Sequence, residues 1–480
     1  MPRSSATSPP KTRQAPRRKS ARHLPRCLAL VRLDVEFRAV DQAWLEELRE
    51  FVAIPSVSAD PAHQDDVHRA AEWVRDFVKR AGGEAELQRR GTRDLVIGDI
   101  PATTNGAGAP TVMVYGHFDV QPPAPLDLWE SPPFELQERD GWLYARGIAD
   151  DKGPLYTLLK AAQLMREENS LPVNIRIACD GEEEIGGHSI VDFLEEDDRG
   201  ADVCVIFDGG PTRPEQPEFA LATRGLVGFH VTMRTGDRDM HSGYYGGAAL
   251  NAIHALIQTL TALLARDGRL PEPLREGATP LTDVEKASFE HLPTGAQILD
   301  DADATVLDPK APEEFYERTW AEPSLDVNGI FGGKPDFVNT TLVVEAHARF
   351  TIRLAPGQDP DTIAAAAERL LREAAPDGAQ LTIERENSAA PGVFAPDLPA
   401  IKLGMDAFER ALGTRPILVR VGGTLPIYPA LAAKGIATIG TGFALRESNV
   451  HSPNERLRVE DVGRAVSAAR ELYTSLAGLG

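Results

Sequence analysis

The chain has 480 residues, 42% of them hydrophobic, which is enough for two or three globular domains. Its 51 Lys and Arg against 72 Asp and Glu give a net charge of −21, which argues against a general nucleic-acid binder, because phosphate contacts need clustered basic side chains. No apolar run approaches the roughly 20 residues of a membrane-spanning helix. We therefore expect neither nucleic acid nor a membrane as a partner.

The three cysteines, Cys27, Cys179 and Cys204, indicate a reducing compartment. None of them stands in a CxxC spacing, and Cys179 and Cys204 lie inside apolar, strand-like runs. We expect buried thiols rather than disulfides, and a cytoplasmic protein.

Residues 1–33 differ in composition from the rest of the chain. They hold nine Lys or Arg and no Asp or Glu, so the remaining chain carries 42 basic against 72 acidic residues. Such a segment cannot bury a core, and we predict a disordered basic extension. Arg17–Arg18 resembles a twin-arginine start and the composition resembles a transit peptide, but the apolar segment of a signal is missing, because CLALV spans only five residues.

Helical and strand-like segments alternate after this extension, which favours an α/β fold. Asp41 caps a helical pattern through Phe51, and Gly82 closes a second, amphipathic helix. The predicted helices are 41–51, 65–80 and 154–165, and the predicted apolar strands are 93–98, 111–115, 173–179 and 202–207. These segments predict a layered sheet of the βαβ type.

Near residue 220 the pattern changes to that of a smaller unit. Strands are predicted at 226–234, 342–354 and 379–385, with a shorter extended piece near 325–330, and helices at 248–265 and 359–374. This order, β-α-β-β-α-β, is typical of a ferredoxin-like unit. The acidic, proline-bearing segment 268–320 has no readable pattern.

After Pro391 the α/β pattern returns. Helices are predicted at 398–412, from 426 onward and at 459–477, and strands at 416–420 and 435–440. We therefore predict one domain in two parts, 34–220 and 391–480, with a second domain, 221–390, inserted between them.

The stretch TVMVYGHFDVQP, residues 111–122, predicts a site at the end of a buried strand. Gly116 ends the apolar run, and His117 and Asp119 follow it. Open α/β sheets build their sites at the carboxyl ends of strands. Histidine is the commonest metal ligand, and its second ring nitrogen usually meets a carboxylate or carbonyl. Alone, this pattern would be weak evidence for a metal site.

Three acidic clusters and a histidine near the C-terminal end of the chain strengthen the prediction of a metal site. Asp150–Asp151 lie in ARGIADDKG, Glu182–Glu184 follow the strand at 173–179, Asp208 ends the strand at 202–207, and His451 lies in NVHSPNE. Two divalent ions about 3.5–4 Å apart need a bridging carboxylate and terminal His, Asp or Glu ligands. Imidazole and carboxylate without thiolate suit zinc, manganese or cobalt. One further carboxylate would take a proton from water.

Six stretches in order, GHFDVQP, ARGIADDKGP, DGEEEIGG, FDGG, DMHSGYYGG and HSPNE, carry a resemblance that covers about residues 41–475. The chain resembles the two-metal aminoacyl metallopeptidase family of carnosinase, cytosolic nonspecific dipeptidase, glutamate carboxypeptidase and succinyl-diaminopimelate desuccinylase, and is most similar to its dipeptidase branch. The resemblance implies a split zinc-peptidase-type catalytic domain, with a central sheet and flanking helices, and an inserted ferredoxin-like lid and dimerisation domain.

The resemblance also implies a set of roles. Two divalent ions, first of all zinc, with manganese or cobalt as alternatives, are bound by His117, Asp150, Glu184, Asp208 and His451. Asp150 bridges the ions, Glu183 is the general base and Asp119 orients its surroundings. Two assignments stay open, because Asp150 has Asp151 beside it and the base could shift by one residue within the glutamate run.

Substrate residues follow from the same resemblance. His241 resembles the lid histidine that reaches the site of the partner subunit in family dimers and stabilises the oxyanion, which implies a homodimer formed through the lid. Arg353 resembles the lid arginine that grips the terminal carboxylate of the substrate. VGGTLP resembles the glycine-rich substrate loop, with Gly423 and Thr424 as contacts. Val421 replaces an acidic residue and Thr424 a serine, so the specificity stays open.

The leading hypothesis is a metal-dependent dipeptidase that hydrolyses small peptides with a metal-activated water and Glu183 as base. The alternative is an N-acyl amino acid deacylase of the desuccinylase or aminoacylase type. Asp208 favours the first, because dipeptidases of the family tend to carry Asp there and desuccinylases Glu. A catalytically inactive scaffold that pairs through its lid is disfavoured by the intact set of candidate ligands. The preferred side chains of the substrate cannot be read from the sequence.

Overall fold

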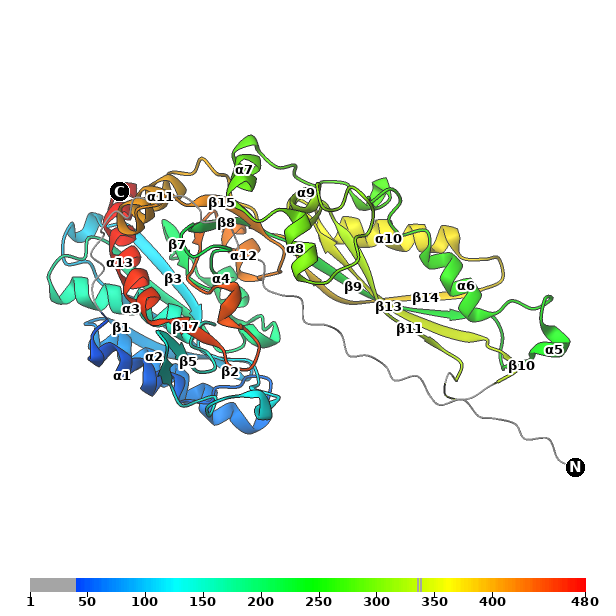
Figure 1. Ribbon diagram of the computed structural model, residues 1–480, viewed down its shortest axis with the longest axis horizontal. Helices are drawn as coiled ribbons and strands as arrows, with labels where there is room; N and C mark the ends of the chain where they lie inside the picture. The colour runs from blue at the N-terminus through cyan, green and yellow to red at the C-terminus, as the bar shows by residue number, and fades with distance from the viewer. Residues whose placement is uncertain (1–39, 335, 337–338) are drawn as a thin grey trace, which may run out of the picture. The chain divides into compact units, whose positions relative to one another are not determined.

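The computed structural model describes residues 40–480 except 335, 337 and 338. The predicted extension over 1–33, and Cys27 with it, lie outside these residues. The described chain contains a mixed eight-stranded sheet with helices on both faces and a separate four-stranded antiparallel sheet (Figure 1). This confirms the predicted α/β class. Among the helices of the described part, none has the length and apolar character needed to span a bilayer.

The eight-stranded sheet has the order β1-β2-β6-β3-β7-β16-β8-β15. Its strands are β1 (Glu84–Arg90), β2 (Arg93–Ile100), β3 (Thr111–His117), β6 (Asn174–Asp180), β7 (Val203–Ile206), β8 (Glu218–Thr223), β15 (Ile417–Val421) and β16 (Ala437–Gly440). The four central strands β6, β3, β7 and β16 run parallel. The six predicted strands are present. Strands β1 and β8 were missed, β1 because its sequence EAELQRR is polar and it lies at the edge of the sheet.

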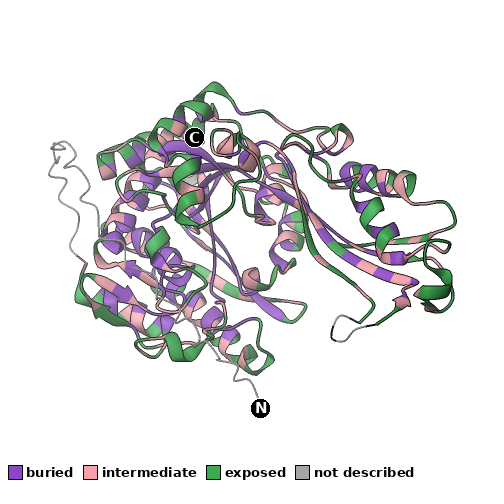
Figure 2. Ribbon diagram, turned by 45° about the vertical axis from the view of Figure 1, so that its right-hand side comes forward, coloured by how far each residue is buried: buried purple, intermediate pink, exposed green. Residues whose placement is uncertain are grey.

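Strand β3 is buried on both faces, which explains its unbroken apolar sequence. Val112 and Val114 pack in the core under α3 and α13, whereas Met113 and Tyr115 pack in the core under α4 and α12. The central strands are accordingly the most buried part of this sheet (Figure 2). The prediction that Gly116 ends the strand was wrong, since β3 continues to His117.

Seven helices of the described chain cover this sheet. They are α1 (Gln42–Val52), α2 (Gln64–Arg80), α3 (Lys152–Glu167), α4 (Ser189–Glu196), α11 (Pro399–Leu412), α12 (Ile427–Ala433) and α13 (Val459–Leu476). The Asp41 side chain accepts a hydrogen bond from the Ala43 amide, as the predicted cap requires. Gly82 follows α2 with φ +79°, a left-handed conformation that glycine adopts without strain.

A three-stranded sheet that was not predicted joins distant parts of the chain. It consists of β4 (Gln137–Arg139), β5 (Trp142–Tyr144) and β17 (Arg456–Arg458), in the order β17-β5-β4. Strands of three residues leave no periodic signal in a sequence. Backbone pairing in this sheet connects the loop that follows β3 with the segment that follows His451.

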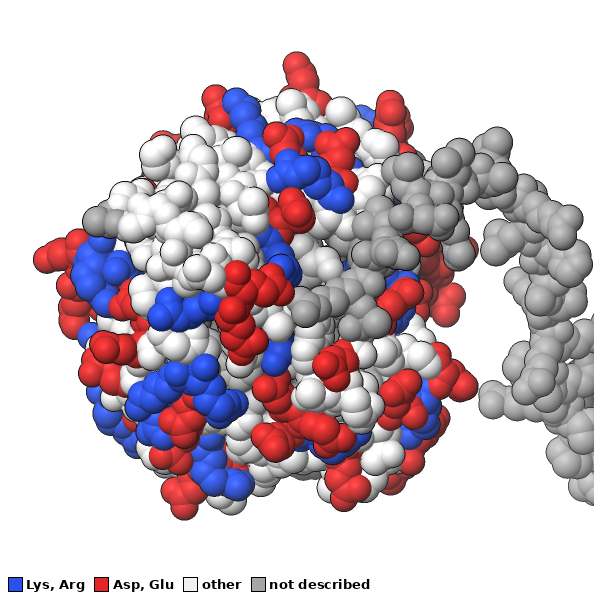
Figure 3. Space-filling model, turned by 90° about the vertical axis from the view of Figure 1, so that its left-hand side faces the viewer, with Lys and Arg blue, Asp and Glu red and all other residues white. Residues whose placement is uncertain are grey.

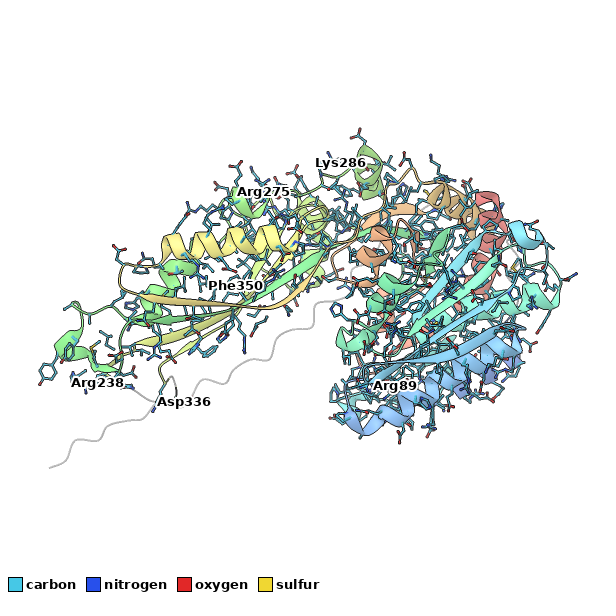
Figure 4. All side chains as sticks on the ribbon, turned by 180° about the vertical axis from the view of Figure 1, so that it is seen from behind. Arg89, Arg238, Arg275, Lys286, Asp336 and Phe350 are labelled. Carbon is cyan, nitrogen blue, oxygen red and sulfur yellow. The ribbon has the colours of Figure 1, made fainter. Side chains whose placement is uncertain are left out.

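The four-stranded sheet has the order β11-β13-β9-β14, with all neighbours antiparallel. Its strands are β9 (Gly225–Arg234), β11 (Ser324–Gly332), β13 (Glu345–Leu354) and β14 (Gln380–Ala389), and its helices are α6 (Ala252–Leu260) and α10 (Pro360–Ala374). The helices share one core with one face of the sheet, in which the Phe350 ring stacks on Phe229 (Figure 4). This confirms the ferredoxin-like unit.

Two boundaries of this unit differ from the prediction. Helix α6 starts later than predicted because Asn251 caps it, accepting hydrogen bonds from the amides of Ile253 and His254, and it ends earlier, at Leu260. The strand predicted at 342–354 is broken, because β12 (Thr341–Leu342) leaves the sheet to pair with β10 (Met240–His241). A short helix, α5 (Ser242–Tyr245), follows β10.

The unreadable segment 268–320 contains the short helices α7 (Asp283–Ala287), α8 (Gly295–Asp301) and α9 (Phe315–Trp320). It packs on β15, where Leu292 and Trp320 share a small core with Val419. Glu285 of α7, the helix that also carries Lys286 (Figure 4), forms a buried ion pair with Arg420. The segment therefore covers the edge strand of the eight-stranded sheet, which would otherwise expose unpaired backbone.

The predicted domain boundary at 220/221 falls within β8, which belongs to the eight-stranded sheet. A division after Thr223 would leave that sheet whole, and the division of the chain into domains stays a prediction. Basic and acidic side chains are interspersed among the described residues on the face in Figure 3.

Candidate metal centre

Three neighbouring parallel strands bring the predicted residues to one edge of the sheet. His117 is the last residue of β3, the acidic turn 181–187 follows β6, and Asp208 lies two residues after β7. Because β6, β3 and β7 are adjacent and parallel, their carboxyl ends meet at the same edge. The predicted convergence of these side chains is therefore present in the structure.

Asp150 lies between two imidazoles. Its Oδ1 is 3.0 Å from His117 Nε2, and its Oδ2 is 2.9 Å from His451 Nε2. Asp208 Oδ2 lies 3.9 Å from His117 Nε2, and Glu184 Oε2 lies 3.1 Å from His451 Nε2. The side chains thus form two groups of ligand atoms that share one carboxylate.

The electrostatics of this cluster show an excess of negative charge. Burial raises the pKa of Asp208 to about 7, and the nearby Asp150 charge adds to the rise. His451 Nε2 donates to the carboxylates of Asp150 and Glu184, and these hydrogen bonds raise the pKa of His451 to about 10. Burial opposes ionisation of Asp150, but the bonds to His117 and His451 outweigh it and hold its pKa well below the usual range. Bound cations would favour the ionised form of these buried carboxylates.

Divalent ions fit the donors in this cluster. Ligand atoms of His117, Asp150 and Glu184 all lie within 4.8 Å of one another. Imidazole nitrogens and carboxylate oxygens are the ligands that zinc, manganese and cobalt accept. The thiols of Cys179 and Cys204 are free and buried in the sheet.

Asp119 joins His117 to the acidic turn. His117 Nδ1 lies 3.1 Å from the Asp119 carbonyl, so its Nε2 faces the cluster. The Asp119 carboxylate accepts hydrogen bonds from the amides of Glu183 and Glu184, at 3.3 and 3.2 Å. One buried residue therefore fixes an imidazole and the turn beside it, as residues behind metal ligands commonly do.

The three consecutive glutamates have different surroundings. Glu182 accepts a hydrogen bond from the Ser189 amide at the start of α4, and Glu184 binds His451 and Gln121 Nε2. Within the described chain, no hydrogen bond or ion pair involves the Glu183 carboxylate. Burial raises the pKa of Glu183 to about 8, and the neighbouring charges of Asp208 and Glu184 contribute. Glu183 is the glutamate of this turn that remains available to a substrate or water.

The adjacent aspartates, Asp150 and Asp151, also have different surroundings. Asp151 accepts a hydrogen bond from the His117 amide at 3.2 Å, and among the described residues its carboxylate has no hydrogen bond or ion pair with either imidazole. A Cβ at position 116 would lie 2.6 Å from this carboxylate, which explains the glycine in β3. Asp150 is the aspartate that faces the cluster.

The inserted unit brings Arg353 to the glycine-rich loop. Arg353 Nη1 donates to Thr424 Oγ1 at 3.0 Å, and the amide of Arg224 donates to the Gly423 carbonyl. The structure thus places three of the four predicted substrate residues at one junction.

His241 is the exception. It pairs with Thr341 next to the Glu345 end of β13, whereas Arg353 is near the other end (Figure 1). Ten strand residues span about 30 Å. His241 is exposed, and its Nδ1 accepts from the Gly243 amide, so its Nε2 is free to donate.

Three residues at the site were not assigned from the sequence. Gln121 donates a hydrogen bond to the Glu184 carboxylate. Arg146 forms an ion pair with Glu455, which also accepts a hydrogen bond from the Asp150 amide. All three lie inside the stretches FDVQP, ARGIADD and HSPNE that carried the resemblance. That position was the available signal, but a motif does not say which of its residues bind metal and which hold the backbone.

Comparison with known proteins gives one family. The model of peptidase family M20/M25/M40 matches residues 113–475, which is most of the chain. The Cys-Gly metallodipeptidase of Schizosaccharomyces pombe is 26% identical, covering 89% of this chain and 95% of its own. The human Beta-Ala-His dipeptidase is 28% identical, covering 88% and 89%. Among solved structures, an M20 family metallo-carboxypeptidase of Sulfolobus solfataricus superposes with a TM-score of 0.79 at 25% identity, covering 91% and 100%.

Proposed function

Because the chain belongs to peptidase family M20/M25/M40, we propose that it is a metal-dependent dipeptidase that hydrolyses the peptide bond of small peptides. The observation that carries this proposal is the Asp150 carboxylate, which has one oxygen toward each of two imidazoles, with the unpaired Glu183 in the adjoining turn. Relatives that align over nearly their whole length are named dipeptidases.

Two divalent ions are the proposed cofactors, with zinc as the first choice and manganese or cobalt as alternatives. His117 and Asp208 would hold one ion, His451 and Glu184 the other, and Asp150 would serve both. When bound, such ions polarise a peptide carbonyl and lower the pKa of water. This division follows the two groups of ligand atoms that share Asp150.

Glu183 is proposed as the proton carrier. It would accept the proton of the attacking water and deliver it to the leaving amine, which needs a carboxylate that is close to the ligands without being one. Burial raises the pKa of Glu183 above that of an exposed glutamate, which makes its carboxylate a stronger base. Asp119 would hold the turn that carries it.

Substrate recognition is assigned to Arg353, Gly423 and Thr424. A guanidinium suits a terminal carboxylate because it donates two parallel hydrogen bonds. Arg353 donates to Thr424, so both polar groups would meet a substrate at the same place.

We propose that the active enzyme is a homodimer. About 30 Å of strand separates His241 from Arg353 in one chain, so His241 would complete the site of the partner subunit, donating Nε2–H to the developing oxyanion. The same tip carries Tyr244 and Tyr245, which are 84% and 49% exposed. Exposed aromatic side chains are common anchors of protein contacts. The cytoplasmic location stays a prediction from the free, buried thiols.

The test is hydrolysis by full-length protein, stripped of metal and reconstituted with zinc, manganese or cobalt. The panel contains dipeptides with a free α-amino group and N-acyl amino acids. We expect turnover of dipeptides in the reconstituted form and none in the stripped form. Turnover of the N-acyl amino acids alone would replace this proposal with the deacylase, and turnover of neither class would reject both.

A further inference from the structure

A buried carboxylate, that of Glu455, connects the two loops that carry Asp150 and His451. Glu455 is fully buried and accepts hydrogen bonds from three backbone amides of the Asp150 loop, those of Gly147 at 3.1 Å, Ala149 at 2.8 Å and Asp150 itself at 3.2 Å. The fourth donor is Arg146 Nη1 at 2.6 Å.

Arg146 and Asn454 extend this connection. The Arg146 guanidinium also donates to the Ser452 carbonyl at 3.4 Å, in the loop that follows His451. Asn454 donates from Nδ2 to the Leu128 carbonyl at 2.8 Å and accepts from the Glu130 amide at 2.9 Å. The segment from His451 to Glu455 is therefore bonded on both sides to loops more than 300 residues earlier in the chain.

The chemistry of this arrangement requires a carboxylate. Three amide hydrogens and one guanidinium converge on two oxygens, and an ionised carboxylate offers acceptors only. A glutamine would turn an NH₂ group toward these donors and leave Arg146 without its counter-charge. Buried ion pairs are poor sources of stability, and their best-attested use is to specify one geometry.

The geometry specified here is that of the ligands. One of the amides bound by Glu455 belongs to Asp150, so the carboxylate fixes the backbone from which the shared ligand projects. At the other end, His451 has φ +62°, a conformation that a histidine keeps only when its surroundings impose it.

We propose that Glu455 is a positioning residue, which holds Asp150 and His451 in the mutual arrangement that binds a divalent ion, although it touches neither ion nor substrate. The inference rests on the ligand assignment made above. It extends that assignment to a residue whose loss weakens metal binding without removing a ligand.

The test compares two variants of the full chain, Glu455→Gln and the control Glu285→Gln. Glu285 forms the other buried Arg–Glu pair described above, with Arg420, in the segment that covers β15. Both variants remove one charge from a buried ion pair, so both lose stability, and the unfolding midpoint of the metal-free proteins measures that loss. The separate readout is zinc affinity, titrated against a competing chromophoric chelator.

We expect Glu455→Gln to bind the zinc ion held by Asp150 and His451 about ten- to a hundred-fold more weakly. This is the usual effect of losing a residue that positions a metal ligand. Glu285→Gln should bind both ions within about twofold of the wild-type affinity, because it leaves the Asp150 loop intact. Wild-type zinc affinity in folded Glu455→Gln would overturn the proposal, and so would an equal loss of affinity in both variants.

If Glu455→Gln does not fold, Glu455→Asp decides the question. Aspartate keeps the counter-charge of Arg146 but is one methylene shorter, so its oxygens cannot reach Arg146 and the three amides together. We expect weaker binding of the zinc ion that Asp150 and His451 would hold, and unchanged affinity would overturn the proposal. A wild-type protein that binds zinc but hydrolyses no dipeptide would reject the proposed function and leave this inference standing.

Discussion

At the scale of single residues, the surroundings decide between chemically identical side chains. The sequence limited the candidates for the general base to Glu182–Glu184. It limited the candidates for the metal ligand shared by both ions to Asp150 and Asp151. Glu182 accepts a hydrogen bond from the nearby Ser189 amide, and Glu184 faces His451 from a distant segment of the chain. The Glu183 carboxylate has no hydrogen bond or ion pair among the described residues. Residue types and spacing could therefore indicate the cluster but could not assign Glu455, whose role depends on amides more than 300 positions earlier.

Replacing Glu183 by Ala should keep both metal ions and lose about 10²–10⁴-fold in kcat, because it removes the proton carrier and no ligand. Glu182→Gln is the matched control, since it alters the neighbouring glutamate and keeps an oxygen for the Ser189 amide. Steady-state kinetics and metal analysis check this. Loss of one ion in Glu183→Ala would make Glu183 a ligand and move the base to a neighbour.

Replacing Asp150 by Ala should lose metal as well as turnover. The Asp150 carboxylate has one oxygen toward each imidazole. Without this negative charge, the two divalent cations would repel each other at short range. Metal content after dialysis against a weak chelator measures the loss. Retention of two tightly bound ions would transfer the shared position to Asp151.

At the scale of elements, burial on both faces makes strands easy to predict. Strand β3 is apolar along its whole length because a core lies on each side of it, and the other central strands follow the same rule. The three-residue strands β4, β5 and β17 have no such pattern, and their existence depends on pairing between segments far apart in the chain. The start of helix α6 was predicted four residues too early because the effect of the Asn251 cap was not recognised.

Replacing Phe350 by Ala should destabilise the inserted sheet by about 3–5 kcal/mol, the usual cost of truncating a buried aromatic residue. Phe350 is buried, stacks on Phe229 and packs under α6 and α10. Metal content should not change, because every proposed ligand projects from the other sheet or its loops. Denaturant unfolding checks the loss, with the exposed neighbour Arg349→Ala as the control. A loss of metal in Phe350→Ala would show that the two sheets are coupled.

At the scale of the whole molecule, the α/β pattern that stops near residue 220 and returns after 391 made the insertion predictable. The segment 268–320 was not predictable, since its short helices are stabilised by packing on β15 rather than by their own periodicity. The position of His241 likewise depends on the pairing of β10 with β12. A resemblance could give that residue a role, but only the fold places it at the end of the sheet opposite Arg353.

Co-expression of Glu183→Ala with His241→Ala should restore activity that neither variant has alone. In a hybrid dimer one site would lack both residues and the other would have both, because His241 would act in the partner subunit. Differently tagged subunits allow the hybrid to be isolated before its activity is measured. A pure hybrid without activity would mean that His241 acts in its own subunit or does not act in catalysis.

The central claim is that the cluster around Asp150 binds two divalent ions and that the loaded cluster hydrolyses peptides. The most direct measurement titrates metal-free, full-length protein with zinc while bound ions per subunit and dipeptide turnover are recorded in the same samples. The account predicts that turnover is absent in the metal-free protein and reaches its maximum at two ions per subunit. Full turnover without bound metal, or two bound ions without turnover of any dipeptide, would contradict it.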